Sequence, residues 1–364
     1  MGIQQILLGY GGAAKTFYGD RGVTGGGNGN TNIIAYFDIT STGNATDFGD
    51  LTVGRYDLSP TSDGSRGVFS GGANPSVTNT IDYITVASTG NATDFGDLPS
   101  ARHAQGQGTI SDGTTGLWAG GDSAGGMLNE IIKITIATTG DASDFGDLGS
   151  AFRYFGTCCS LTRGVWGGAY NSSPCNAGCN YIGYVTIATP GNSNDFGDLN
   201  DNIYRNQGCS SETRGLFGGG MSPRTNMIDY ITIATTGNAT DFGDLDTAID
   251  TGSATSNNTR GIFSGGNSNP GTCNVIQYVT IDTTGNATDF GDLTIARRNL
   301  AATQNGPEGG DGGANPERGI FGGGNVGGTN SNVIDRFSIP TAGNASDFGD
   351  LTVARTDISA CSGD

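Results

Sequence analysis

The chain has 364 residues, of which 66 are glycine and only 14% are charged. Its 35 acidic and 17 basic residues give a net charge of -18, which works against a nucleic-acid partner, because affinity for a phosphate backbone comes from Lys and Arg that displace counterions. No window approaches the roughly 18 consecutive apolar residues of a membrane span, so we expect no membrane insertion either.

The first nineteen residues differ from the repeated pattern that fills the rest of the chain. They lack the basic stretch that opens a secretory signal peptide. We expect residues 1–19 to be an N-terminal extension that covers a face, packs on the rim or anchors the protein, and residues 20–364 to form one domain. The apolar candidates for an anchoring contact are Ile3, Ile6, Leu7, Leu8 and Tyr10.

A five-residue motif, Asp-Phe-Gly-Asp-Leu, divides the remaining chain into seven copies of one unit. The copies lie 46 to 58 residues apart, and they begin at Asp47, Asp94, Asp144, Asp195, Asp241, Asp289 and Asp347. That period is compatible with a four-stranded propeller blade, whose repeats span about 40 to 50 residues. The sequence therefore predicts an all-β, seven-bladed β-propeller with four antiparallel strands per blade.

Four strands can be placed within each copy. Strand A follows an arginine, as in Arg297-Arg298-Asn299-Leu300-Ala301, and strand B runs from an Arg-Gly pair to a double glycine, as in Arg260-Gly261-Ile262-Phe263-Ser264-Gly265-Gly266. Strand C is an apolar run such as residues 275–281, and strand D contains Asp-Phe-Gly-Asp-Leu. Apolar side chains fall on both faces of strand C, which suits a blade packed between two neighbours.

This order of landmarks resembles the kelch repeat. In that family a double glycine ends strand B, a tyrosine lies in strand C, and an aromatic residue in strand D precedes an arginine. Gly265-Gly266, Tyr278, Phe290 and Arg297 fill those positions here. The family usually has Trp where this chain has Phe290, so the resemblance implies a divergent relative.

The two ends of the repeated region complement each other. Residues 354–361 have the pattern of a strand A with no strand B after it, while Arg21-Gly22-Val23 begins a strand B with no strand A before it. We expect the C-terminal strand to complete the first blade, which leaves the ring without a free edge.

Recognition residues are expected in the loops that depart most from the repeat, because loops on a rigid scaffold usually carry binding. The alternative is that these loops vary without a function. Three segments stand out, at residues 169–180, 221–226 and 305–317. Their candidate residues are Tyr170, Asn171, Met221, Arg224, Asn305, Glu308 and Asp311.

The chain offers few residues for metal or nucleophile chemistry. His103 is its only histidine, which argues against a histidine metal centre or a catalytic triad. Two alternatives stay open for Cys175 and Cys179, a short local disulfide or free thiols, whereas Cys158, Cys159, Cys209 and Cys361 fall in predicted A strands as small buried residues.

The repeated Asn and Asp residues have alternative explanations. Their oxygens suit Ca²⁺, but the spacing of an EF-hand is missing, and turn formation explains them better. The motif's Asp residues and the repeated arginines are also candidates for ion pairs within or between blades. No catalytic residue, cofactor or metal is predicted.

The opening Gly-Ile-Gln-Gln-Ile-Leu-Leu-Gly resembles the N-terminal segment of some virion-associated proteins of marine bacteriophages. The repeated Thr-Gly-Asn-Ala-Thr-Asp-Phe-Gly-Asp-Leu resembles kelch-like proteins of phages and marine microbes. These resemblances imply a non-enzymatic structural or appendage protein of a fibre, tail or capsid. Such a protein would be made in the host cytoplasm and displayed on the virion surface, where it binds other virion proteins or a host-surface glycan or receptor. The alternatives are a carbohydrate-active enzyme built on a propeller and a host-encoded kelch scaffold.

Overall fold

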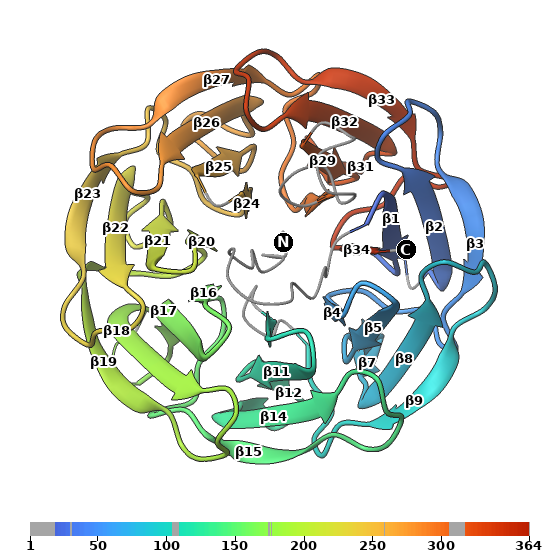
Figure 1. Ribbon diagram of the computed structural model, residues 1–364, viewed down its shortest axis with the longest axis horizontal. Helices are drawn as coiled ribbons and strands as arrows, with labels where there is room; N and C mark the ends of the chain where they lie inside the picture. The colour runs from blue at the N-terminus through green and yellow to red at the C-terminus, as the bar shows by residue number, and fades with distance from the viewer. Residues whose placement is uncertain are drawn as a thin grey trace.

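Seven four-stranded antiparallel sheets surround a central axis in the computed structural model (Figure 1), which describes residues 19–29, 31–103, 109–173, 175, 177–257, 259–305 and 317–363. The described residues form strands and turns and no helix, so no described segment is a helix that could span a membrane. The predicted seven-bladed, all-β propeller is confirmed, and its architecture is compatible with a kelch-like repeat.

We number the blades I to VII in chain order and label the strands of each blade A to D from the axis outwards. Blade I consists of β34 (Ser359–Gly363), β1 (Arg21–Gly25), β2 (Ile33–Asp38) and β3 (Thr46–Asp50). Blade II consists of β4 (Ser59–Ser62), β5 (Arg66–Ser70), β8 (Thr80–Thr85) and β9 (Thr93–Asp97). Blade III consists of β10 (Ile110–Ser111), β11 (Thr115–Ala119), β14 (Glu130–Thr135) and β15 (Ser143–Asp147). Blade IV consists of β16 (Gly156–Cys159), β17 (Arg163–Asn171), β18 (Ala177–Thr186) and β19 (Asn194–Ile203).

The remaining blades follow the same order. Blade V consists of β20 (Gln207–Ser210), β21 (Arg214–Gly218), β22 (Met227–Thr232) and β23 (Thr240–Asp244). Blade VI consists of β24 (Ser253–Ser256), β25 (Arg260–Ser264), β26 (Val275–Thr280) and β27 (Thr288–Asp292). Blade VII consists of β28 (Ala301–Gln304), β29 (Arg318–Gly322), β32 (Val333–Ser338) and β33 (Ser346–Asp350).

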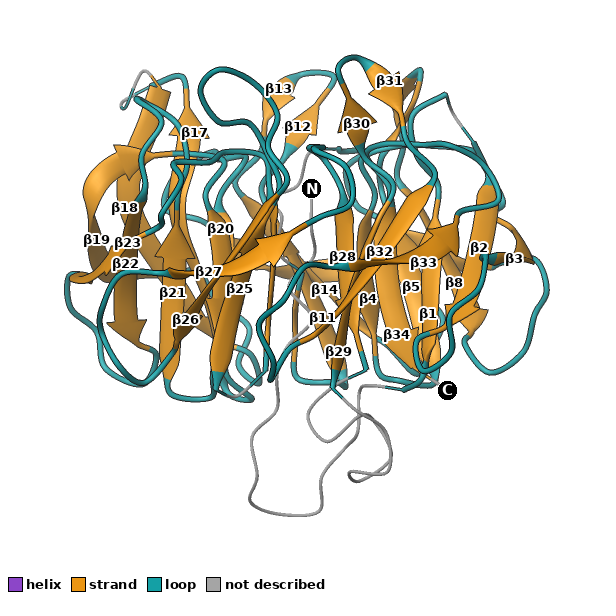
Figure 2. Ribbon diagram, turned by 90° about the horizontal axis from the view of Figure 1, so that it is seen from above, coloured by secondary structure: helices purple, strands orange, loops and turns teal. Residues whose placement is uncertain are grey.

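Short hairpins extend the connections between strands B and C on one side of the ring. They are β6 (Ala73–Asn74) with β7 (Ser76–Val77), β12 (Asp122–Ser123) with β13 (Gly126–Met127), and β30 (Asn325–Val326) with β31 (Thr329–Asn330). We call this side the B–C face, and it is at the top of Figure 2. The connectors that lead from strand D to strand A of the next blade return to the same face.

The ring closes through the C-terminal strand, as the sequence predicts. Strand β34 pairs antiparallel with β1, and Gly363 is opposite Arg21 while Ser359 is opposite Gly25. The innermost strand of blade I therefore comes from the far end of the chain, and the sheet order is β3-β2-β1-β34.

Apolar side chains on both faces of strand C bind each blade to its neighbours. One core cluster, for example, joins Ile262 and Ile276 of blade VI with Phe321 and Phe337 of blade VII. Burial of each such side chain stabilises the fold by roughly 1.5–3 kcal/mol, so packing between blades is a large favourable contribution.

The Asn of the Thr-Gly-Asn turn links each blade to the one before it. Asn286 Oδ1 of blade VI accepts a hydrogen bond of 3.1 Å from the backbone N–H of Asp244 in blade V. The same bond recurs at every junction, and at the last one Asn44 accepts from Asp350. Blade III uses Asp141 in this position. These residues thus brace adjacent blades, beyond the local turn-forming role expected from the sequence.

The repeated arginines do not pair with the Asp residues of the motif in the described part of the chain, so that expectation is wrong. The connector arginines are instead buried against strand C of the following blade: Arg55 Nη1 is 2.6 Å from Asp82 and Arg297 Nη2 is 3.0 Å from Asp335. Burial lowers the pKa of Arg297 to about 10, although the Asp335 charge opposes this shift. Such pairs fix blade register more than they stabilise.

Candidate functional site

The seven D-to-A connectors meet around the axis on the B–C face. Six of them contain one non-glycine residue with φ between 53° and 59°, a conformation that side chains rarely adopt. The corresponding position of the connector that leads into blade III lies within residues 104–108, outside the described residues. We call these six residues the collar: Asp57, Tyr154, Arg205, Thr251, Asn299 and Asp357.

Backbone hydrogen bonds join neighbouring collar residues. The N–H of Arg205 donates to the Tyr154 carbonyl at 2.7 Å, and the N–H of Asn299 donates to the Thr251 carbonyl at 3.1 Å. The N–H of Asp57 likewise donates to the Asp357 carbonyl at 3.3 Å. The collar is therefore held by the scaffold in an uncommon backbone conformation, which in proteins tends to cluster at functional sites.

In six of the seven blades, the residue before the collar position faces the B–C connection of its own blade. Isolated β-bridges join Arg153 with Tyr170 and Tyr204 with Met221, and four other blades have equivalent bridges. The second residue before the collar is buried in most blades, as Arg55 and Arg297 are. Side-chain variety is therefore concentrated in the collar and in the residues beside it.

Blades IV and V bring three tyrosines and two arginines together at the collar. The Arg153 guanidinium lies 4.9 Å from the Tyr154 ring centroid and 4.6 Å from that of Tyr170. Arg205 is 4.9 Å from the Tyr154 ring, and the rings of Tyr170 and Tyr204 meet edge to face at 5.4 Å. We call these five residues the tyrosine cluster. Each of them remains partly exposed.

Burial raises the pKa of Tyr154, and the charge of Asp57 adds to the shift although Arg153 opposes it. The phenol consequently stays protonated at neutral pH and can donate a hydrogen bond. Arg153 also forms an ion pair with Asp122 of the blade III hairpin, which holds its guanidinium in place.

The opposite part of the collar is acidic. Asn299 Nδ2 donates to Asp357 Oδ1 at 2.8 Å, and His103 Nδ1 lies 3.5 Å from Asp57 Oδ2. Burial raises the pKa of Asp357, and the Asp57 charge raises it further. The collar thus combines carboxylates on one side with guanidinium groups and aromatic rings on the other.

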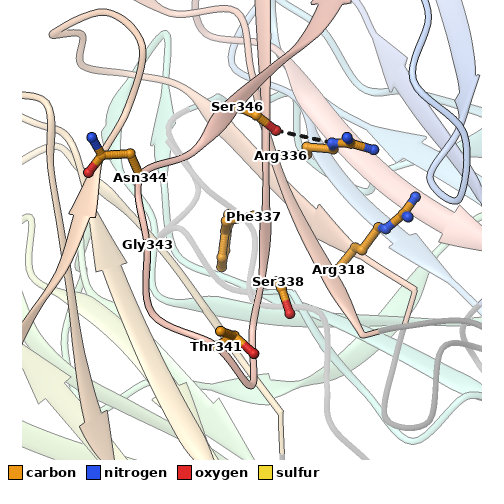
Figure 3. A pocket seen from close by; sticks show the side chains of 8 residues that line it. All are labelled: Arg318, Arg336, Phe337, Ser338, Thr341, Gly343, Asn344 and Ser346. Carbon is orange, nitrogen blue, oxygen red and sulfur yellow. Dashed lines mark hydrogen bonds between the residues drawn. The ribbon is translucent and has the colours of Figure 1, made fainter.

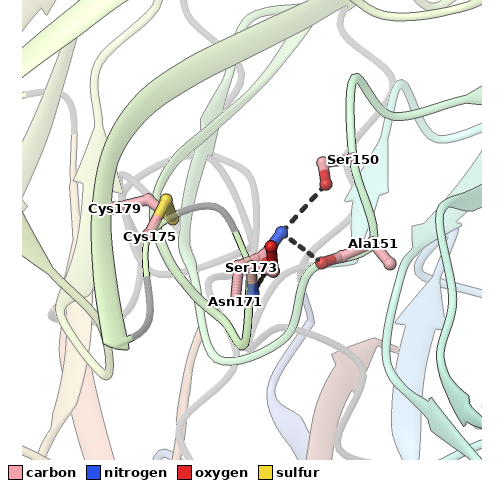
Figure 4. The surroundings of a disulfide bond; sticks show 6 residues. All are labelled: Ser150, Ala151, Asn171, Ser173, Cys175 and Cys179. Carbon is pink, nitrogen blue, oxygen red and sulfur yellow. Dashed lines mark hydrogen bonds between the residues drawn. A yellow bond between two sulfur atoms is a disulfide. The ribbon is translucent and has the colours of Figure 1, made fainter.

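Only some of the predicted recognition residues of blades IV and V lie at the candidate site. Tyr170 joins the tyrosine cluster, while Asn171 is buried and donates to Ser150 Oγ at 2.9 Å and to the Ala151 carbonyl at 3.0 Å (Figure 4). Met221 pairs with Tyr204, and Arg224 Nε is 2.6 Å from the buried carboxylate of Asp250. Asn171 and Arg224 therefore hold loops together.

Cys175 and Cys179 form a disulfide in the structure (Figure 4), so the disulfide alternative holds. Cys158, Cys159, Cys209 and Cys361 are buried in A strands with free thiols, as the sequence predicts. Within the described ranges, no group of three or more His, Cys, Asp or Glu side chains is arranged to hold a metal ion.

The other predicted residues lie elsewhere. Asn305 is buried after β28, away from the B–C face, where it accepts from the Arg318 N–H at 2.9 Å. The remaining candidates lie outside the described residues: Glu308, Asp311, Ile3, Ile6, Leu7, Leu8 and Tyr10.

No protein-family model matches the chain, and no curated protein sequence matches it. The candidate site therefore rests on geometry. Sequence reasoning missed the collar, although the repeat carries a signal. The second residue after the buried connector arginine is polar, as Asp57, Asn299 and Asp357 are, and the residue after it is a buried Leu or Ile.

Proposed function

We propose that the protein is a non-enzymatic, kelch-like binding protein displayed on a phage particle, and that its collar attaches the particle to a saccharide of the host surface. The opening segment resembles that of some virion-associated proteins of marine bacteriophages and the repeat resembles kelch-like proteins of phages and marine microbes, which supports the display. The chemistry of the collar supports the ligand class.

The tyrosine cluster is the observation that carries the proposal. Aromatic rings offer apolar faces to the C–H surfaces of sugars, and arginine donates several hydrogen bonds from one plane. Arg153 lies 4.6 Å from the Tyr170 ring centroid and Arg205 lies 4.9 Å from that of Tyr154, so the cluster combines both properties. The propeller holds these groups in place before binding, which reduces the entropy lost on association.

A glycan array with the purified protein tests the ligand class. Tyr154→Asn and Arg205→Asn remove one cluster side chain each, and asparagine tolerates the positive φ at both positions. We expect each variant to lose at least about tenfold in affinity, or about 1.4 kcal/mol. Val353→Ser changes an exposed side chain outside the collar and should bind normally. Equal binding by all four proteins would contradict the proposed site.

Location is tested separately with purified phage particles. The protein should be detected in them by mass spectrometry, and removal of residues 1–19 should release it if that segment anchors it. A shortened protein that still assembles onto particles would refute the anchoring role. A gene product found only in uninfected host cells would favour the host scaffold.

A carbohydrate-active enzyme is the second candidate, and the two collar carboxylates favour it. Glycoside hydrolysis needs one carboxylic acid with a raised pKa beside a second carboxylate, and Asp357 and Asp57 offer that pair. Depolymerisation of a bound polysaccharide that is lost in Asp357→Asn would establish this activity. Binding without cleavage supports the non-enzymatic proposal.

A further inference from the structure

A second site follows from the two blades that break the repeat in strands B and C. In five blades the arginine of strand B stacks on a tyrosine of strand C at 4.2–4.8 Å from the ring centroid: Arg21 on Tyr36, Arg66 on Tyr83, Arg163 on Tyr184, Arg214 on Tyr230 and Arg260 on Tyr278. Blade III has Thr115 and Lys133 in these positions, and blade VII has Arg318 and Arg336.

Both exceptional blades contain a hollow where the tyrosine ring is missing. The hollow of blade VII has a volume of about 320 Å³, and that of blade III about 240 Å³. Figure 3 shows the blade VII hollow, with Phe337 at its centre and the side chains of Arg318 and Arg336 along one side. It lies beside the turn between strands C and D, at the end of the blade remote from the collar.

The two guanidinium groups in this hollow have no carboxylate partner among the described residues. Arg336 Nε donates to Ser346 Oγ at 3.1 Å, and Arg318 Nη1 donates to the backbone carbonyls of Ile39 and Thr40 in blade I. The strand B arginines of the five regular blades likewise form no ion pair and donate to a carbonyl of the next blade, as Arg66 does to Ile136. Each of them stacks on a tyrosine, however, whereas Arg318 has the second guanidinium of Arg336 in that place. Two unneutralised cations side by side are unexpected in a protein with a net charge of -18.

Nearby charges do not neutralise the pair. Burial lowers the pKa of Arg318, and the Arg336 charge lowers it further, while the charges of Asp38 and Asp20 offset only part of this shift. Asp38 is already engaged, since it accepts hydrogen bonds from Thr40 and Ser41. An anion placed between the guanidinium groups would relieve their mutual repulsion.

The rest of the lining supplies polar groups of neutral charge. Hydroxyl groups come from Ser338, Thr341 and Ser346, and Asn344 contributes an amide whose Oδ1 already accepts from Asp292 in the preceding blade. The amide nitrogen of Asn344 is a donor, as are the remaining guanidinium N–H groups. Planar guanidinium donors match the paired oxygens of a carboxylate, sulfate or phosphate.

We propose that the blade VII hollow binds a single oxyanion group, either as a free inorganic ion or as the sulfate or carboxylate of one saccharide unit. The volume is that of a small ligand site. The overall negative charge repels long polyanions, which favours a ligand with one charge.

Blade III provides an internal control. Its hollow has the same position in the repeat but is lined by Lys133 and Asp141, which are one cation and one carboxylate. It should not select anions. Lys133→Tyr and Arg336→Tyr each restore the tyrosine found in five blades, and both variants should therefore fold.

Calorimetric titration of the full chain with sodium sulfate, galactose 6-sulfate and galactose tests the proposal. Wild type and Lys133→Tyr should bind both sulfated probes, and Arg336→Tyr should lose at least about tenfold in affinity for them. Any binding of galactose would belong to the collar and should be the same in all three proteins. Tighter binding of galactose 6-sulfate than of sulfate identifies a saccharide as the source of the group, and equal binding identifies the free ion.

Two results would overturn the proposal: no heat with either sulfated probe, or unchanged binding by Arg336→Tyr. Thermal unfolding of each variant confirms that it is folded. Because the collar is remote from this hollow, Tyr154→Asn should leave sulfate binding unchanged, so failure of one site does not imply failure of the other.

Discussion

The buried carboxylates of strand C show how a single residue depends on its counterpart in the connector. Asp335 of blade VII is fully buried and accepts from Arg297 Nη2 at 3.0 Å and from Thr294 Oγ1 at 2.6 Å. Asp229 of blade V occupies the same position, but Ile203 takes the place of the arginine, and Asn200 is its hydrogen-bond partner. One sequence position thus carries a paired charge in one blade and an unpaired one in another.

Asparagine substitution should distinguish these two sites. Asp335→Asn leaves the Arg297 guanidinium buried without a counterion, which we expect to cost about 3–5 kcal/mol. Asp229→Asn removes no ion pair and should cost about 1 kcal/mol or less at pH 7. Urea unfolding at pH 7 measures both, and similar losses would contradict the role assigned to Arg297.

The pH dependence of stability should also change at Asp229. Burial raises its pKa above the ordinary value of 3.8, so the native protein binds more protons than the unfolded chain between 3.8 and the raised value. This group therefore makes the protein less stable as pH rises through that window. Asp229→Asn should remove this pH dependence. The difference in unfolding free energy between wild type and variant, measured from pH 3 to 7, should therefore change with pH, and a constant difference would contradict the role given to Asp229.

At the scale of the strand, the glycine of Asp-Phe-Gly-Asp explains why the motif repeats so regularly. In β23, Gly243 has a φ of 139°, and a Cβ there would lie 2.5 Å from the Gly285 carbonyl carbon of blade VI. The equivalent contact occurs at all seven junctions. The glycine of the motif is therefore required by the close approach of neighbouring blades.

A pair of alanine variants tests this requirement. Gly243→Ala must push blades V and VI apart and should lose more than about 2 kcal/mol. Gly285→Ala has a similar φ of 155° but open space around its Cβ, so it should lose only the smaller backbone cost of about 1 kcal/mol. Thermal unfolding measures the stability of both variants. A greater loss of stability in Gly285→Ala than in Gly243→Ala would rule out the steric explanation.

Repetition determined which elements could be predicted. Strand C around Tyr278 and strand D around Phe290 could be placed because the same pattern of burial serves each blade. Collar residues such as Tyr154 and Asp357 were not predicted because they are about 200 residues apart in the sequence. They belong to one site only because the seven connectors converge at the axis. Asn171 and Arg224 were predicted as recognition residues because their sequence neighbours show no partner for them. Their partners, Ser150 and Asp250, lie in D-to-A connectors.

At the scale of the whole molecule, strand β34 links three blades of the ring. Ser362 Oγ donates to the Gln304 carbonyl of blade VII, and Ser62 Oγ of blade II donates to the Ser362 carbonyl. The closing strand therefore connects the blades on either side of blade I as well as pairing with β1.

Removal of residues 359–364 should open the ring. We expect a lower melting temperature and self-association, because the exposed edge of β1 can pair with another chain. Light scattering and thermal unfolding measure these effects, and a peptide covering residues 355–364 should reverse them by strand addition. A shortened protein that remains monomeric and equally stable would show that closure contributes little.

The reactivity of the buried thiols tests whether the ring is closed. Burial raises the pKa of Cys361 to about 12, and Cys158, Cys159 and Cys209 are likewise buried with raised pKa values. A thiol reagent at pH 8 should therefore react with these four residues only as fast as the protein opens. Rapid reaction of Cys361 in the native protein would contradict a stably closed ring.

Closure by β34 also has a consequence for synthesis. Strand β1 is made more than 300 residues before its inner partner, and at roughly 5–20 residues per second the ribosome needs about 20–70 s to cover that interval. Throughout this time the nascent protein carries an unpaired sheet edge. Translation rate and chaperone protection therefore become part of how this ring is assembled.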